Sequence, residues 1–514
     1  MRRTALLEAL SIPSDKPNLL LIQADQLKPQ VLNTYGGTAD TPHLDSLADE
    51  GVVFENAYCN FPLCAPSRFS MLAGMLPSRI GAYDNGAEYL AQIPTMAHYL
   101  RLAGYHTCLS GKQHFVGPDM LHGFHERLVP ELYPTDFSWA PSWDEVRMDS
   151  NSDASGVTRA GVCTRSVQID HDEAVLYRAK AKLHDYARSD GQPFFLVASF
   201  THPHEPYFAL QQYWDRYRHD DIPMPLTALQ PEASREPHTD RILRHHALHD
   251  GGITESHVRT ARHGYLANVS YFDDMLGDLL ATLQQTGLSS NTVILLTADH
   301  GDMLGEHGLW FKKHFFDHAS RVPLIVHAPE YFASGRSLVN VSLVDLLPTL
   351  CDLAGFKVEE HASQALDGSS LVSQCEHPEH ANSRAVYAEI TSEGVPAPMF
   401  MVRSGQYKLI QGGDVPPVLY DLANDPEERS NVADQPELTD TRRSLGSLIQ
   451  NCWDPASLER DIRLSQRRRR LVHAAHQKGT APVWDHRPED PTVPWIHRGP
   501  ELYNDWAWRG IETP

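Results

Sequence analysis

Short runs of apolar residues, continuous rather than alternating with polar ones, recur along the chain and most constrain its fold. They are Asn18–Ala24, 193–198, 292–297 and 322–326. A strand that is apolar on both faces is typical of a parallel sheet covered by helices. Helical patterns separate the runs, notably at 173–188 and 256–285. We therefore predict an α/β fold with a large, mostly parallel central sheet flanked by helices.

After about residue 380 the pattern changes. The segments 399–403 and 407–410 flank Ser404-Gly405-Gln406, which predicts a hairpin, and a further strand is expected at 419–422. Helical patterns follow at 435–450 and 455–477. We expect a main α/β domain over residues 1–380 and a smaller domain over 381–480, with an antiparallel sheet and helices.

The last segment, 481–514, is rich in proline and tryptophan and has no clear periodicity. Large aromatic side chains rarely stay free in solvent, so this tail is expected to pack on another surface. A neighbouring subunit is one such surface. We therefore predict a homo-oligomer.

The net charge and the cysteine content limit the binding partners and the cellular compartment that we expect for this protein. The formal net charge of -22 argues against a nucleic-acid or anionic-membrane partner, because both attract basic surfaces. No stretch approaches the roughly 20 apolar residues that span a bilayer. The seven cysteines are scattered, odd in number and without paired metal-site spacing, which favours a reduced, cytoplasmic setting.

Acidic residues stand directly after two of the predicted strands. Asp25 follows the first run, and Asp299 and His300 follow the run at 292–297. Parallel strands bring such residues to one edge of the sheet. Taken singly, each is more often a cap or loop residue. Together, two carboxylates and one imidazole predict a divalent metal site, better suited to Ca²⁺ or Mn²⁺ than to a structural zinc.

Lysines and histidines are expected at the same edge. Lys112 and His114 follow a predicted strand at 105–109, His204 follows the run at 193–198, and Lys312 lies beyond Asp299. Lysines can hold the oxygens of an anion, and histidines can move protons near neutral pH. Any single one of the 29 histidines is more often a surface or core residue.

The stretch Cys64-Ala65-Pro66-Ser67-Arg68 has the pattern read by the enzyme that oxidises cysteine to formylglycine. A helix that ends at Gly74 would put residue 64 at its N-terminus, where backbone N–H groups favour an anion. A thiolate that attacked a sulfate ester could not easily shed the sulfonate. The hydrated aldehyde has two hydroxyls, one to attack and one to expel sulfate.

These motifs together resemble the formylglycine-dependent sulfatases of the alkaline phosphatase superfamily, from about residue 16 to at least 431. The signature at 64–68, Asp25, and the stretches 111–114, 203–206 and 299–301 occur in that family's order. The resemblance implies a sulfatase catalytic domain over 1–380, matured by a formylglycine-generating enzyme. It also implies a set of metal ligands, namely Asp25, Asp299, His300 and the modified residue 64.

The resemblance implies further roles in catalysis. Arg68 would steady the aldehyde hydrate, and Lys112 and Lys312 would bind the sulfuryl group. His114 would take the proton that starts sulfate release, and His204 would contact the sulfuryl group or protonate the leaving alcohol. Asn85 would contact a sulfuryl oxygen.

Within the family, the set of Asp25, Asp299 and His300 resembles that of choline sulfatases and phosphonate monoester hydrolases. Many other sulfatases have a second aspartate at the position of Gln26. In choline sulfatases a cationic head group is held by aromatic and acidic residues, and Trp139 and Glu389 are the matching candidates. Packing and ion pairing are the alternative roles of these two side chains. The stretch 140–147 lacks the aromatic–histidine cluster that choline sulfatases have there.

We therefore expect a sulfuric ester hydrolase that acts on a small soluble sulfate monoester, either choline sulfate-like or an aryl sulfate. The alternative is a phosphonate monoester or phosphodiester hydrolase with the same site, because the transition states are similar. A non-catalytic anion-binding protein is a third reading, which predicts lost ligands, whereas the expected charged residues are present.

Overall fold

The computed structural model describes residues 16–144, 152–189, 191–232, 235–248, 252–380, 384–413, 415–485, 503–508 and 511. Within these residues a nine-stranded sheet forms the centre, in the order β11-β2-β10-β8-β1-β6-β3-β4, with β9 paired to β2. The strands are β1 Asn18–Ala24, β2 Val52–Tyr58, β3 His106–Gly111, β4 Glu126–Arg127, β6 Phe194–Ser199, β8 Thr292–Ala298, β9 Arg321–Val322, β10 Leu324–His327 and β11 Gly335–Ser342.

The middle of the sheet is parallel, as the apolar runs predict. β1 pairs in parallel with β6 on one side and with β8 on the other, and all seven of its residues are buried. β3 continues the parallel arrangement beside β6. The predicted α/β fold with a mostly parallel central sheet is thus confirmed.

The run at 322–326 differs from the others in direction. Its strand, β10, pairs antiparallel with both β8 and β2. An apolar run reports burial on both faces, which is typical of parallel strands but is shared by an antiparallel strand in the middle of a covered sheet. Direction is set here by the loop that returns from β8, which also carries Asp299 and Lys312.

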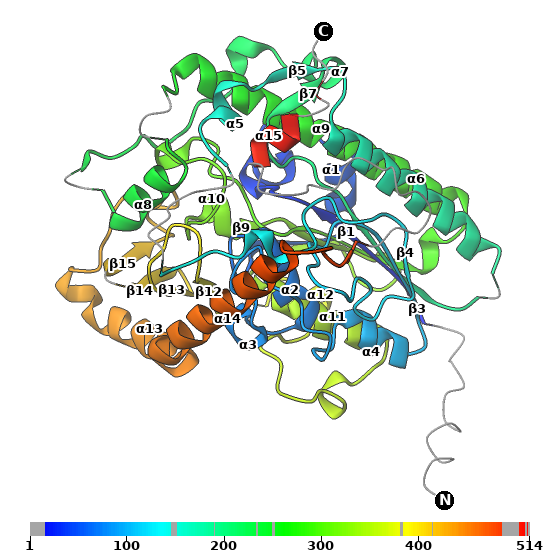
Figure 1. The fold of residues 1–514 in the computed structure, drawn as a ribbon. Coiled ribbons are helices and arrows are strands. Elements are labelled where there is room, and N and C mark those ends of the chain that lie inside the picture. Colours follow the sequence, from blue (N-terminus) through cyan, green and yellow to red (C-terminus); the bar gives the residue numbers. More distant parts are fainter. Residues whose placement is uncertain are drawn as a thin grey trace, which may run out of the picture.

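Helices cover both faces of the sheet (Figure 1). The long helices α6 (Val167–Ala187) and α9 (Glu255–Gln285) lie together on the upper face, and α2, α4 and α11 lie on the lower one. The remaining helices of this part are short, apart from α1 and α8. The bounds are α1 Pro42–Asp49, α2 Cys64–Ala73, α3 Pro77–Ile80, α4 Met96–Leu102, α5 Ser155–Thr158, α7 Gln211–Trp214, α8 Pro237–His245, α10 Asp317–Ser320, α11 Leu346–Leu353 and α12 Val372–Glu376. A two-stranded parallel ribbon, β5 (Gly161–Cys163) and β7 (Phe208–Leu210), packs on α9.

The region after residue 380 contains the predicted antiparallel sheet. Its four strands are adjacent in chain order, namely β12 Ala385–Ile390, β13 Met399–Ser404, β14 Tyr407–Gly412 and β15 Val415–Asp421. The hairpin between β13 and β14 closes with Ser404 opposite Tyr407, around Gly405 in the left-handed region at φ +56°. The helices α13 (Thr439–Cys452) and α14 (Pro455–His476) follow, close to their predicted bounds.

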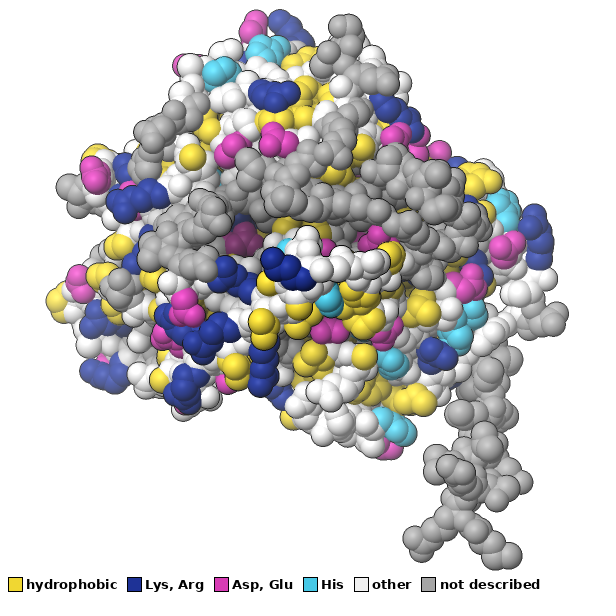
Figure 2. Space-filling model, in the orientation of Figure 1, with side chains coloured by type: hydrophobic (Ala, Val, Ile, Leu, Met, Phe, Trp, Pro, Cys, Tyr) yellow, Lys and Arg dark blue, Asp and Glu magenta, His cyan; other side chains and the backbone are white. Residues whose placement is uncertain are grey.

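The basic run 467–470 lies on α14, which also carries Glu459 and Asp461. Figure 2 shows Lys and Arg side chains mixed with Asp and Glu on the face of the molecule that it draws. One member of this run turns inward. Arg469 forms a buried bidentate ion pair with Asp84, at 2.6 and 2.7 Å. Asp84 also accepts a hydrogen bond from the backbone of Gly86. α14 is therefore tied to the loop that follows α3.

The described residues include no helix both long and apolar enough to cross a lipid bilayer. All seven cysteines are unpaired, and six of them are buried.

Replacing Arg469 by methionine would leave the Asp84 carboxylate buried without its cation. Because breaking a buried ion pair from one side is costly, we expect the free energy of unfolding in urea to fall by about 3–5 kcal/mol. The matched control is Arg463→Met on the same helix, where the exposed pair with Asp144 contributes less than about 1 kcal/mol. Equal losses in the two variants would contradict this role for Arg469.

Candidate active site

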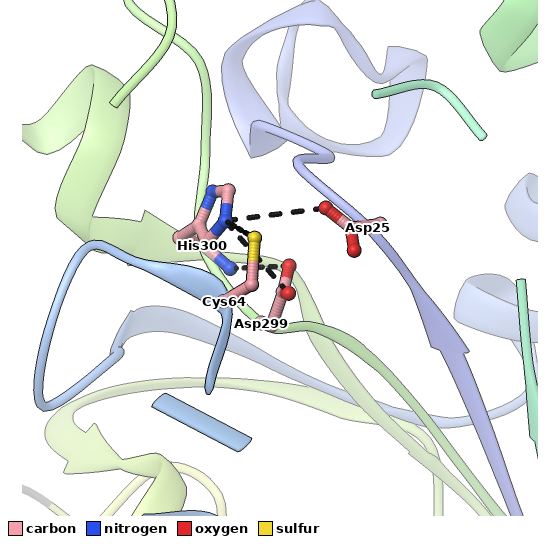
Figure 3. A group of neighbouring side chains, drawn as sticks. All are labelled: Asp25, Cys64, Asp299 and His300. Carbon is pink, nitrogen blue, oxygen red and sulfur yellow. Dashed lines mark hydrogen bonds and ion pairs between the residues drawn. The ribbon is translucent and has the colours of Figure 1, made fainter. Parts of the chain in front are cut away.

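Two acids and an imidazole converge at the carboxyl ends of β1 and β8. Because Ala24 pairs with Ala298, the next residues, Asp25 and Asp299, are neighbours at this edge. The Nε2 atom of His300 is 3.9 Å from Asp25 Oδ1, 3.8 Å from Asp299 Oδ2 and 3.3 Å from the Sγ atom of Cys64 (Figure 3). One ligand atom from each of the four residues lies within 4.8 Å of the others, and all four residues are buried.

Cys64 lies at the beginning of α2, as predicted. The preceding residue, Leu63, is extended, and the helix ends at Gly74 in the left-handed region. The backbone N–H of Ala65, in the first turn, donates to the side-chain oxygen of Asn85 at 2.9 Å. Asn85 therefore lies over the N-terminal end of the helix, where an anion would be favoured.

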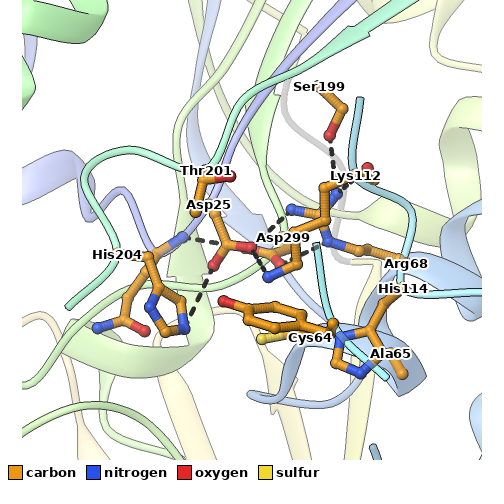
Figure 4. Close-up of polar contacts among 12 residues, drawn as sticks. Asp25, Cys64, Ala65, Arg68, Lys112, His114, Ser199, Thr201, His204 and Asp299 are labelled. Atoms are coloured by element: carbon orange, nitrogen blue, oxygen red, sulfur yellow. Dashed lines mark hydrogen bonds and ion pairs between the residues drawn. The ribbon is translucent and has the colours of Figure 1, made fainter. Parts of the chain in front are cut away.

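Arg68, on helix α2, binds the carboxylates of both Asp25 and Asp299. Its guanidinium donates to Asp299 at 2.8 Å and to Asp25 at 2.9 Å, and it also binds Ser199 and the carbonyl of Lys112 (Figure 4). Its side chain is completely buried. Burial alone would lower the pKa of Arg68, but Asp299 and Asp25 raise it above its ordinary value.

Opposing effects of burial and of neighbouring cations set the pKa of Asp25. Burial raises its pKa, but Lys112, His204 and Arg68 together hold the pKa well below its ordinary value. Lys112 contacts Asp25 Oδ2 directly. The other oxygen, Oδ1, is buried and has no hydrogen-bond partner among the described residues.

This orphaned oxygen fits the predicted metal site. A buried carboxylate oxygen that no donor satisfies is costly, and a cation would satisfy it. Burial also lowers the pKa of His300, which favours the neutral imidazole that binds metals. His300 Nδ1–H donates to the carbonyl of Gly301 at 2.9 Å, leaving Nε2 directed at the cluster. The donor set therefore suits a divalent ion.

Lys312 and His204 lie beside this cluster. The ammonium of Lys312 donates to Gln26 Oε1 at 2.6 Å and to His204 Nε2 at 2.8 Å, with Glu205 at 3.4 Å. His204 Nε2 is in turn 3.9 Å from Asp25 Oδ1. Gln26 thus turns its oxygen toward a lysine, and it is not one of the four clustered ligands.

His114 lies on the opposite side, near Lys112. Its Nε2–H donates to the carbonyl of Asn85 at 3.1 Å, and burial together with Lys112 lowers its pKa well below the ordinary value. The ring of Tyr133 packs on His114 and lies 4.0 Å from the Lys112 ammonium. These contacts hold His114 as a neutral imidazole that can accept a proton.

A narrow cavity of about 30 Å³ opens over residue 64. Its lining includes Cys64, Asn85, His204, Lys312 and the half-buried Trp139. Trp139 is held there because Gly86 packs so closely on the backbone of residues 139 and 140 that a Cβ atom would meet it at 2.6 Å.

Glu389 lies elsewhere, in contrast to its expected place at the head group. It is completely buried on β12, where it accepts hydrogen bonds from the backbone of Ser78 and the indole of Trp453. Burial raises the pKa of Glu389 to about 7. Glu389 thus joins α3 to the C-terminal sheet and helices. The acids that do line the cavity are Glu205 and Glu393.

Sequence reasoning missed seven further residues of the cavity wall, which are Leu63, Tyr133, Ser152, Glu205, Lys313, Glu393 and Tyr503. Lys313 directly follows the predicted Lys312, and Glu205 belongs to the stretch 203–206 that carries the family resemblance. Tyr503 comes from α15 (Tyr503–Trp508) in the aromatic tail, and its hydroxyl lies 3.0 Å from His204 Nδ1. Helix α15 of the tail therefore packs on the cavity of its own chain.

Comparison with protein families matches the sulfatase family over residues 17–356. The chain belongs to the sulfatase family. Residues 305–453 also match the C-terminal region of N-sulphoglucosamine sulphohydrolase, and residues 460–493 match the C-terminal region of choline sulfatase enzymes. Sulfatases hydrolyse sulfuric esters, so this chain is a hydrolase of that class.

Individual relatives agree with this assignment. The chain is 40% identical to a choline-sulfatase of Rhizobium meliloti, covering 92% of this chain and 94% of the relative. It is 27% identical to an arylsulfatase of Clostridium perfringens, over 82% and 91% of the two chains. Its fold matches a phosphonate monoester hydrolase from Silicibacter pomeroyi with a TM-score of 0.69 and 25% identity, covering 85% and 95%.

Glu205 gives a test of the electrostatics beside His204. Burial raises its pKa, but His204 and Lys312 lower it to about 2. The stabilisation is therefore complete above the unfolded pKa of about 4.3 and is lost as the pH falls toward 2. We expect Glu205→Gln to lower the free energy of unfolding by roughly 3 kcal/mol at pH 7 and by progressively less below pH 4.3.

Urea unfolding at pH 7, 5 and 3 measures this difference. The exposed Glu360→Gln variant serves as the control, with no comparable loss at pH 7. A deficit for Glu205→Gln that stayed constant across the range would contradict the charge pairing.

Proposed function

We propose that this sulfatase cleaves a small soluble sulfate monoester, choline sulfate-like or an aryl sulfate, with residue 64 as the nucleophile after its conversion to formylglycine. The observation that carries the proposal is the position of Cys64. Its side chain lies at a helix N-terminus, 3.3 Å from His300 and within the buried group of two acids and an imidazole. A hydrated formylglycine there supplies one hydroxyl to attack sulfur and another to expel sulfate.

Asp25, Asp299, His300 and the modified residue 64 would hold a divalent ion, Ca²⁺ or Mn²⁺. Such an ion lowers the pKa of a hydroxyl bound to it and offsets charge on the sulfuryl oxygens. Arg68 has a separate role in the proposal. It orients both carboxylates and steadies the hydroxyls of the hydrate from the helix side.

The remaining polar residues of the site divide the work of binding and proton transfer. Lys112, Lys312 and Asn85 would hold the sulfuryl oxygens, since Asn85 and Lys312 line the cavity with Cys64 and Lys112 contacts Asp25 beside it. His204, which shares a hydrogen bond with Lys312, would contact the sulfuryl group or protonate the leaving alcohol. His114 would accept the proton whose removal from the second hydroxyl starts sulfate release.

Trp139 and Tyr133 offer aromatic surface on the alcohol side of the cavity, their ring centroids 5.4 Å apart. Aromatic faces suit either a phenol or a cationic head group. The identity to a choline-sulfatase and to an arylsulfatase supports both substrate types. The position of Glu389 leaves the contact with the alcohol to these aromatic residues and to Glu393.

Hydrolysis of a phosphonate monoester or phosphodiester is the second candidate, favoured by the structural likeness to phosphonate monoester hydrolases. Maturation would need a formylglycine-generating enzyme. The seven unpaired cysteines support a reducing, cytoplasmic compartment. A homo-oligomer also stays part of the proposal, on the proline- and tryptophan-rich sequence of the tail.

Replacing Cys64 by alanine removes the nucleophile, so we expect turnover of an aryl sulfate to fall by at least about 10³-fold. Mass spectrometry of the tryptic peptide from the active enzyme should show the aldehyde in place of the thiol. The control, Cys452→Ala, changes an exposed cysteine away from the cavity and should keep full activity. Undiminished activity of Cys64→Ala refutes the mechanism, and faster hydrolysis of the matching aryl phosphonate would favour the second candidate.

Metal binding can be measured without turnover. After treatment with a chelator, addition of Ca²⁺ or Mn²⁺ at 100 times its Kd should stabilise the protein by about 2.7 kcal/mol, seen as a higher Tm. Asp299→Asn should abolish the shift. The control is His380→Ala in the exposed group His377, Glu379 and His380, which should leave it unchanged. An identical shift in both variants would place the ion elsewhere.

A further inference from the structure

Two consecutive lysines line the cavity, and only the first belongs to the sulfuryl site described above. Lys312 points toward Gln26 and His204, whereas Lys313 points toward Glu393 and His245. Both side chains are almost completely buried, with 5% and 4% of their surface exposed. Lys313 therefore adds a second cation to the cavity wall, beside Glu393 and His245 and apart from the contacts of Lys312 with Gln26 and His204.

Lys313 forms an ion pair with Glu393, whose side chain is 15% exposed. The ammonium also donates to His245 Nε2 at 3.2 Å. His245 Nε2 is itself 4.0 Å from Glu393 Oε2. Because both members of the pair line the cavity, an incoming alcohol meets an ammonium and a carboxylate side by side.

The backbone holds both residues of the pair in an uncommon conformation. Lys313 has φ 76° and Glu393 has φ 51°, in the left-handed region that non-glycine residues rarely adopt. The N–H of Lys313 donates to Pro62 at 3.0 Å, and its carbonyl accepts from His238 Nε2 at 2.9 Å. Such conformations persist only where the surroundings determine them, and they cluster at functional sites.

The charge of this subsite distinguishes between possible alcohols. A quaternary ammonium is attracted by the aromatic faces of Trp139 and Tyr133, and a free carboxylate would add to that attraction. Here the carboxylate of Glu393 is already neutralised by Lys313. A permanently cationic alcohol would meet the Lys313 ammonium in a space with little water, where like charges repel strongly.

We propose that Lys313, through its ion pair with Glu393, is a specificity-determining residue that makes this sulfatase prefer sulfate esters of uncharged alcohols or phenols over those of quaternary ammonium alcohols. An uncharged alcohol is not repelled by the Lys313 ammonium. Its polar groups can accept hydrogen bonds from Lys313 and donate them to Glu393. The inference rests on the proposed sulfatase activity and narrows the class of alcohol that the substrate contains.

Two substrates of the same shape test the charge alone. They are choline sulfate and 3,3-dimethylbutyl sulfate, in which carbon replaces the quaternary nitrogen. We expect wild-type kcat/KM to favour the uncharged ester. In Lys313→Met the ratio should shift toward choline sulfate by at least about tenfold, mainly through a lower KM for the cation, because Glu393 then faces the cavity without its partner.

Two further variants serve as controls. Lys313→Arg keeps the charge and should retain the wild-type preference. Lys357→Met removes an exposed lysine on the surface, paired with Glu360, and should leave the ratio unchanged. Circular dichroism and Tm establish that each variant is folded before its kinetics are compared.

The kinetic outcomes distinguish the role of Lys313 from the proposed sulfatase activity. A wild-type preference for choline sulfate, or the same ratio in wild type and Lys313→Met, overturns the role of Lys313 while leaving sulfate ester hydrolysis intact. Failure of the wild type to hydrolyse either ester, or any aryl sulfate, overturns the proposed function and the inference with it.

Discussion

The guanidinium of Arg68 is the interaction on which the rest of the site depends. Two carboxylates, Asp25 and Asp299, are buried side by side at the ends of adjacent parallel strands, where their mutual repulsion would otherwise be severe. Arg68 binds both from the helix that also begins with Cys64. A single helix therefore brings Cys64 to the two acids and compensates their charge.

Charged side chains farther from Arg68 are also held in place by partners of opposite charge or by amides. Lys112 and Lys312 are each held by acids or amides of the site, so the cations that would bind the sulfuryl group are already in position. Farther out, Arg469 ties α14 to the loop of Asp84, and that loop carries Asn85 to the first turn of α2. Residues from the C-terminal part of the chain thus support a site built at the ends of β1 and β8.

Much of the central region follows from local sequence patterns. Continuous apolar runs predicted the strands at 18–24 and 292–297, and the residues that follow them formed the expected cluster, because burial and strand ends are local properties. Glu389 illustrates the limit. Its place on β12 is set by packing against Ser78 and Trp453, which are 311 and 64 residues away in the chain. Lys313 and Glu393 likewise meet only through the fold, 80 residues apart.

The sequence by itself determined the cysteine motif at 64–68, the acids at the strand ends and the α/β arrangement, because these depend on residue type, local pattern and strand burial. Only the tertiary structure decided the antiparallel direction of β10, the wall of the cavity and the pairing of Lys313 with Glu393. These depend on which distant segments pack together, and the packing free energy is shared among many residues that no short motif contains.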